Sequence, residues 1–163
     1  MGRGRLNLLL LGLALLLGLA AVLLPDPRGA QPPPAVALDP AGLVRLEARF
    51  PRGGEPLRLE RRDDGWWLTA PVAREARRGR VVRLLESLRE RTGSCYPAAE
   101  HAPAEFGLAP PRVVLLLDGR RVEFGDRAGD GRRYLRTDGR LCLVEDVVVP
   151  MLAGGADTLA PVD

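Results

Sequence analysis

The chain has 163 residues, the length of one domain, with 24 basic and 21 acidic side chains and a net charge of +3. This charge is too small to predict nucleic-acid binding. One histidine and two cysteines cannot form a Cys/His zinc cluster within the chain. Every basic side chain is arginine, as expected from a GC-rich genome, so arginine content alone predicts no function.

Residues 6–24 form an apolar segment in which Asn7 is the only polar side chain. As a helix this segment would be about 28 Å long, close to the thickness of a bilayer's hydrocarbon core. Arg3 and Arg5 precede it, whereas Arg28 is the first basic residue after it. The positive-inside rule therefore predicts a cytoplasmic stub over 1–5 and a transmembrane anchor over 6–24. The remainder would be periplasmic, which predicts a single-pass protein of the bacterial inner membrane.

A cleaved signal peptide is the alternative for this segment. Signal peptides usually have a shorter apolar stretch, followed closely by a cleavage site with small residues. The best such site, Ala35-Val36-Ala37, lies more than ten residues beyond the apolar segment. No cysteine stands at the end of the apolar segment, which excludes a lipoprotein anchor. We therefore favour the uncleaved anchor, embedded in the lipid bilayer through residues 6–24.

Residues 25–40 are rich in proline and are predicted to form a spacer. Proline favours an extended path of about 3.1 Å per residue, so the spacer could reach roughly 50 Å. A disordered linker would serve the same purpose. A PxxP-type ligand for an aromatic groove is a further alternative. The prolines are Pro25, Pro27, Pro32, Pro33, Pro34 and Pro40.

Residues 41–163 are predicted to form the periplasmic domain. Alternating apolar residues predict strands over 43–50, 57–60 and 66–69, separated by turns rich in Gly, Pro and Asp. Residues 73–91 then change to a helical period. Their apolar stripe has the i, i+3, i+4, i+7 spacing and comprises Val81, Leu84, Leu85 and Leu88.

Two hairpins follow the helix. Asp118-Gly119 is a type I′ turn signal, which pairs Val113 with Phe124 and Leu115 with Val122 on one buried face. Asp138-Gly139 is a second signal, which joins 133–137 to 141–145 and sets Leu135 opposite Cys142. A short helix over 147–153 ends the domain. The fold class is therefore α+β: a mainly antiparallel sheet packed by one amphipathic helix and preceded by the transmembrane helix.

The order of several short motifs in residues 57–153 resembles the bacterial family called domain of unknown function 4340 (DUF4340). The family's usual Tyr and Asp are replaced here by Phe106 and Ala109, and the chain holds one copy of a unit that many members carry in longer form. The motifs are Gly65-Trp66 with Leu68 and Pro71, the 73–91 helix, Phe106-Gly107-Leu108-Ala109-Pro110-Pro111, Phe124-Gly125 and Tyr134-Leu135-Arg136.

The resemblance implies a membrane-anchored periplasmic domain without assigned catalytic residues. Some members of the family are associated with gliding-motility-type ABC transporters, so it also implies an auxiliary role at such a transporter. We accordingly expect a non-enzymatic protein-interaction module whose partner is another membrane or periplasmic protein, with no nucleic acid, cofactor or metal. The alternatives are a scaffold of a secretion or pilus machine and, from another class, a periplasmic hydrolase.

Four residues are candidates for partner contact. Trp66 and Trp67 are neighbours in a strand and point to opposite faces, so one should be core and the other either covered by a loop or exposed to a partner. Arg77 and Arg80 belong to a helix rich in arginine, which would either face solvent or contact anionic lipid or an acidic partner.

Cys95 and Cys142 are the only thiols and could form a disulfide in an oxidising compartment. Two unpaired buried cysteines or a reactive thiol are the alternatives. A nucleophile and base pair of Cys95 and His101 lacks an orienting residue, which argues against catalysis. Asp126 and Asp130 lack the bidentate acid of a calcium loop, so a hairpin loop is predicted there.

Overall fold

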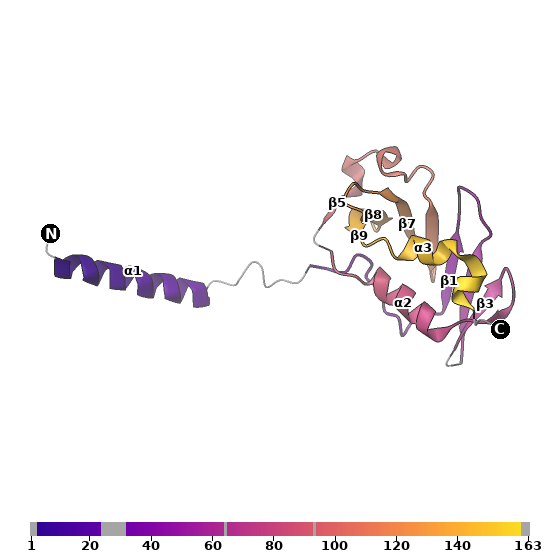
Figure 1. Ribbon diagram of the computed structural model, residues 1–163, viewed down its shortest axis with the longest axis horizontal. Helices are drawn as coiled ribbons and strands as arrows, with labels where there is room; N and C mark the ends of the chain where they lie inside the picture. The colour runs from indigo at the N-terminus through magenta and orange to yellow at the C-terminus, as the bar shows by residue number, and fades with distance from the viewer. Residues whose placement is uncertain (1–2, 24–31, 64, 93, 161–163) are drawn as a thin grey trace. The chain divides into compact units, whose positions relative to one another are not determined.

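The computed structural model describes residues 3–23, 32–63, 65–92 and 94–160, and it divides the chain into two compact units, Met1–Pro32 and Pro33–Asp163. The first unit contains one helix, α1 (Arg3–Leu23) (Figure 1). Its exposed side chains include Leu10, Leu11, Leu13, Leu15, Leu16 and Leu19. Among the described residues, no helix is both long enough and apolar enough to cross a bilayer.

The second unit begins inside the segment that the sequence predicts as spacer. Ala35 and Val36 are fully buried. Their backbone N–H groups donate to the carbonyl oxygens of Glu90 (2.8 Å) and Leu88 (3.2 Å). The predicted spacer over 25–40 therefore differs from the structure at its C-terminal end, because residues from Pro33 onward belong to the domain. Residues 1–2, 24–31 and 161–163 lie outside the described residues, and with them parts of the predicted stub, anchor and spacer.

Nine strands of the described residues form one sheet, in which every pair of neighbours is antiparallel. The spatial order is β4-β3-β2-β1-β6-β7-β8-β9-β5. The strands are β1 (Arg45–Arg49), β2 (Leu57–Arg62), β3 (Gly65–Ala70), β4 (Arg74–Glu75), β5 (Cys95–Pro97), β6 (Val113–Leu117), β7 (Arg120–Arg127), β8 (Arg133–Thr137) and β9 (Arg140–Val144).

Both predicted hairpin registers are confirmed. Val113 pairs with Phe124 and Leu115 with Val122, and all four side chains are buried. In the second hairpin Leu135 lies opposite Cys142. The aspartates of both Asp-Gly turns have positive φ, as a type I′ turn requires.

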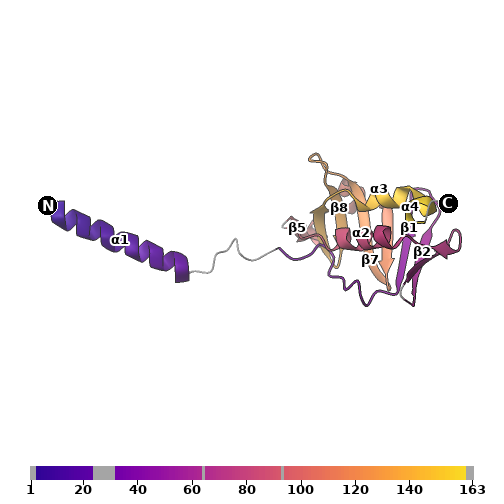
Figure 2. The same ribbon diagram turned by 60° about the horizontal axis from the view of Figure 1, so that its bottom comes forward.

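Three helices lie across one face of the sheet, as Figure 2 shows: α2 (Arg78–Leu88), α3 (Val148–Ala153) and α4 (Gly155–Leu159). The stripe predicted to be buried in α2 is buried, and it packs against the inward side chains of the strands. The fold is therefore α+β with one large antiparallel sheet. The helix is shorter than the predicted 73–91, because Arg74 and Glu75 pair with β3 as the edge strand β4.

Two short 3₁₀ helices, η1 (Ala98–Glu100) and η2 (Pro103–Phe106), connect β5 to β6. Gly107 follows η2 in the left-handed conformation, with φ of 65°, which glycine adopts more easily than other residues. The carbonyl oxygen of Phe106 lies where a Cβ on Gly125 of β7 would sit. The 98–111 connection therefore lies directly against the strand face opposite the helices, which we call the outer face.

Candidate functional site

The outer face of the sheet divides into a covered half and an open half. Over β7, β8 and β9, the ring of Phe106 packs edge-on against Tyr134, with 4.8 Å between the ring centroids. Leu108 of the 98–111 connection and Leu141 of β9 are both buried there. Over β1, β2 and β6 no comparable segment of the described chain covers the strands. The open half is therefore the part of the sheet available for a partner.

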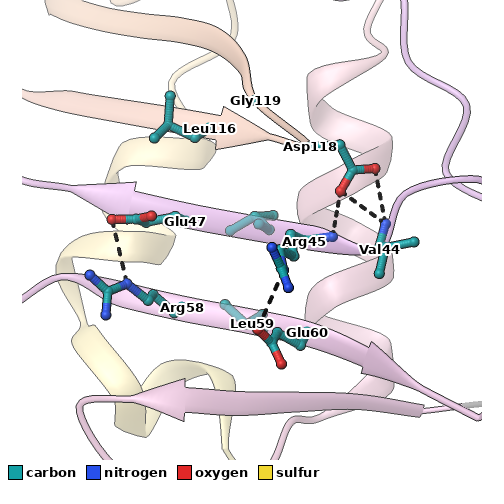
Figure 3. A pocket seen from close by; sticks show the side chains of 10 residues that line it. Val44, Arg45, Glu47, Arg58, Leu59, Glu60, Leu116, Asp118 and Gly119 are labelled. Atoms are coloured by element: carbon teal, nitrogen blue, oxygen red, sulfur yellow. Dashed lines mark hydrogen bonds and ion pairs between the residues drawn. The ribbon is translucent and has the colours of Figure 1, made fainter.

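A cavity of about 590 Å³ occupies the open half, and we call it the outer groove. Figure 3 shows it with the strands in front of the helices. Val44, at its rim, is 52% exposed, and Leu116 of β6 is half-buried. The lining residues are Val44, Arg45, Leu46, Glu47, Arg58, Leu59, Glu60, Leu116, Asp118 and Gly119.

Charges of alternating sign line the groove because period-two strands place every second side chain on this face. Arg45 of β1 lies 3.5 Å from Glu60 of β2, between Nε and Oε1. Glu47 accepts a hydrogen bond from Nε of Arg49 at 2.7 Å and lies 3.5 Å from Nε of Arg58. The groove thus presents paired charges around an apolar strip, which suits a polypeptide with both polar and apolar side chains better than a small anion.

Asp118 fixes the end of the groove. Its carboxylate accepts hydrogen bonds from the backbone N–H of Val44 (3.1 Å) and of Arg45 (2.7 Å). The N–H of Asp118 in turn donates to the carbonyl of Arg45 at 3.0 Å. The β6–β7 turn therefore holds the start of β1, and Asp118 serves a structural role rather than a chemical one.

The electrostatics of the groove do not favour acid–base chemistry. The hydrogen bond from Arg49, helped by the charges of Arg49 and Arg58, lowers the pKa of Glu47 below its ordinary value despite some desolvation. A carboxylate held ionised in this way is a poor general acid at neutral pH. Among the described residues that line the groove there is no Ser, Cys or His. The arrangement is suited to binding.

The two tryptophans have different environments. Trp66 is 4% exposed and belongs to the core, with the guanidinium of Arg61 5.5 Å from its ring. Trp66 is therefore not available as the predicted partner contact. Trp67 is half-buried beside Arg62, 5.4 Å from its ring, and is paired in register with Glu60. Of the two tryptophans, Trp67 lies beside the outer groove, because its register partner Glu60 lines the groove.

Arg77 and Arg80 lie at the start of α2, on the helical layer rather than on the outer face. With Arg78, Gly79 and Arg83 they line a shallow hollow of about 490 Å³. The structure therefore does not bring them together with Trp67 into one contact surface.

Cys95 and Cys142 form a disulfide, with 4.1 Å between their Cα atoms. They face each other in the β5–β9 pair, because the edge strand β5 sits directly beside β9. Of the three alternatives left by the sequence, the structure has the bridge. A thiol at Cys95 is then absent, which removes the pair with His101. The His101 ring instead contacts Phe106, 5.5 Å away between centroids.

Other carboxylates of the domain pair with arginines. Asp126 accepts hydrogen bonds from Arg52 (3.0 Å) and Arg112 (2.5 Å), and these outweigh desolvation and lower its pKa. Asp130 accepts two hydrogen bonds from Arg132, one from the backbone N–H and one from the side chain. Within the described ranges, no group of three His, Cys, Asp or Glu side chains could hold a metal ion.

Comparison with known proteins found no matching family model, no matching curated sequence and no matching solved structure. The resemblance to the DUF4340 family therefore stays a prediction from the sequence.

Sequence reasoning did not find the outer groove. The alternation in residues 43–50 and 57–60 correctly indicated charged side chains on one strand face. The position of β6 beside β1 is a pairing between residues far apart in the chain, and no local pattern encodes it. The cluster of Tyr96, His101, Phe106 and Tyr134 was missed for the same reason.

Proposed function

We propose that this protein is a non-enzymatic binding module held at the bacterial inner membrane, with its sheet domain in the periplasm. The observation that carries the proposal is the Cys95–Cys142 disulfide. Disulfides persist in oxidising compartments such as the periplasm and are rare in the cytosol. An exported domain of this kind needs a segment that directs it to the membrane.

The proposed anchor is the apolar segment 6–24. It is supported by the helical backbone of Arg3–Leu23, which satisfies its own hydrogen bonds as a lipid environment demands. Leu13 and Leu16 are more than half exposed, although leucine in soluble proteins is usually buried. The two arginines before the segment favour a cytoplasmic N-terminus.

The proposed partner surface is the outer groove. Paired charges around Leu116 and Val44 suit recognition of another protein, because apolar side chains supply affinity while charges select the partner. The class of partner comes from the DUF4340 resemblance and is a membrane component of an ABC transporter.

A reporter fusion tests the compartment. Alkaline phosphatase, which is active only outside the cytosol, is fused after residue 163, and membranes are separated from soluble protein. We expect an active enzyme in the membrane fraction, at full-length mass, and no thiols that react with an alkylating reagent before reduction. The variant Leu10→Arg/Leu13→Arg/Leu16→Arg should lose membrane association. An active soluble reporter, an inactive membrane-bound one or two free thiols would refute the proposal.

Photo-crosslinking in cells tests the groove. A photoreactive amino acid replaces Leu116 in one strain and Val147, an exposed apolar residue before α3, in a matched control. We expect a discrete adduct with a membrane protein only at Leu116. Equal adducts at both positions, or none at Leu116, would exclude the groove as the docking surface.

A further inference from the structure

The start of α2 carries a cluster of four arginines for which the described part of the chain provides no ion-pair partner. Arg77, Arg78, Arg80 and Arg83 surround one shallow hollow, with Gly79 as its remaining lining residue. Arg78 and Arg83 are exposed and the other two are half-buried. In the part of the chain that the structure describes, none of the four forms an ion pair.

Their lack of ion pairs with described residues distinguishes these four arginines from those of the sheet. Arg45, Arg49 and Arg58 on the outer face each lie beside a glutamate. A codon bias toward arginine explains the number of arginines in both places. It does not explain why one set is neutralised by carboxylates and the other leaves several positive charges together.

We infer that the arginine cluster of α2 docks the domain on the anionic phospholipid headgroups of the bilayer in which the protein is anchored. The inference rests on the proposed function, since it requires the anchor at residues 6–24. Each basic side chain close to an anionic membrane surface adds about 1 kcal/mol of favourable binding energy, which corresponds to about a fivefold change in the equilibrium constant for docking. Three charges together should therefore change it roughly a hundredfold.

The length of chain between the units supports lipid as the occupant. Residues 24–32 can span at most roughly 30 Å when fully extended. A domain tethered that closely to a membrane experiences its headgroups at a high effective concentration. Weak contacts from a few arginines are then sufficient, whereas an acidic protein in solution has no such advantage.

Energy transfer measures the docking with the full-length protein. Trp66 and Trp67 are the only tryptophans. The carbonyl of Trp66 accepts a hydrogen bond from the N–H of Ala76 at 2.8 Å, so the donors lie close to the start of α2. The protein is placed in nanodiscs that contain a trace of dansyl-headgroup lipid. One set of discs is purely zwitterionic phosphatidylcholine and the other contains about one third phosphatidylglycerol.

We expect stronger transfer in the anionic discs than in the neutral ones. This difference in transfer should disappear in 0.5 M salt, because the Debye length, over which charges interact, falls to about 4 Å. It should also disappear in the variant Arg78→Gln/Arg80→Gln/Arg83→Gln. The matched control is Arg49→Gln/Arg120→Gln/Arg121→Gln, which removes the same charge from other exposed positions and should behave as the unaltered protein. Circular dichroism melts verify that both variants fold.

Each outcome decides between explanations. Equal transfer in the two kinds of disc overturns the inference and leaves an acidic protein as the remaining partner for the cluster. Equal losses in the two variants also overturn it, because net charge rather than the α2 surface would then drive the contact. A chain that fails to enter even the neutral discs overturns the anchor, and with it the proposed function.

Discussion

At the scale of single residues, Gly125 of β7 is the position where the 98–111 connection lies closest to the outer face of the sheet. A Cβ built there would lie 2.0 Å from the carbonyl oxygen of Phe106, which is backbone and cannot rotate away. We expect Gly125→Ala to displace the 98–111 connection and to destabilise the domain by about 1–3 kcal/mol, as overpacking does. The denaturant midpoint of the purified protein measures the effect.

The control for this prediction is Gly79→Ala. Gly79 lies in α2, and a Cβ there meets nothing within 4 Å. Alanine is the better helix former, so this variant should stabilise the domain by roughly 0.5 kcal/mol. A Gly125→Ala protein as stable as the Gly79→Ala protein would contradict the close approach of the loop.

A buried ion pair links stability to pH. Asp146 and Arg133 are both largely buried, and Nη2 of Arg133 donates to Oδ2 of Asp146 at 3.0 Å. Burial alone would raise the pKa of Asp146, but hydrogen bonds from Arg133 and Arg127 outweigh it and lower the pKa. Because the folded state then holds its proton less tightly than the unfolded chain, this contribution is present at neutral pH. It is lost as the pH falls below about 4.

We expect Asp146→Asn to cost about 3 kcal/mol at pH 7, since it leaves the Arg133 charge buried without its partner. The difference from the unaltered protein should shrink as both are unfolded at successively lower pH. Asp130→Asn serves as control, because the side chain of Asp130 is 48% exposed, so its ion pair with Arg132 should contribute much less than a buried pair. A constant difference between pH 7 and pH 3 would contradict the assignment.

At the scale of elements, the disulfide secures a short edge strand, β5. β5 has only three residues and lies at the sheet edge, paired to β9 alone. The bridge joins residues 47 positions apart. In the chain-entropy model, closing such a loop contributes at most about 4 kcal/mol. We expect Cys95→Ala/Cys142→Ala to lose about 2–4 kcal/mol of unfolding free energy.

Reduction of the unaltered protein should cause the same loss, and it should have no effect on the double variant. Chemical unfolding with and without reductant measures both. Reduction that destabilises the double variant as well would show that the bridge is not the cause.

Local patterns predicted most elements, and non-local contacts account for the differences. Each Asp-Gly turn sets the register of the two strands that it joins, so both hairpin registers could be predicted from the sequence. The helix stripe at Val81–Leu88 could be predicted from its period. By contrast, β4 and β5 were not predicted, because each is too short to show a period and exists only beside its partner strand. The outer groove depends on such a pairing, which is why none of the predicted partner residues except Trp67 lies beside it.

At the scale of the whole molecule, the boundary of the domain is the feature that sequence composition misplaces. Proline content predicted a spacer as far as residue 40, whereas the compact unit begins at Pro33. Prolines at 33 and 34 do not prevent the next residues from packing, and Ala35 and Val36 are completely buried. The segment is also fixed from the other side, since Nη2 of Arg140 donates to the carbonyl of Ala35 at 3.2 Å.

Two fragments test this boundary. We expect residues 33–163 to unfold at the same denaturant concentration as the full chain. Residues 41–163 should be less stable by about 2–4 kcal/mol. They lose the burial of Ala35 and Val36 and leave the carbonyls of Leu88 and Glu90 without their donors. Equal midpoints for the two fragments would restore the predicted boundary at residue 41. A lower midpoint for the longer fragment than for the full chain would instead indicate that residues before Pro33 stabilise the domain.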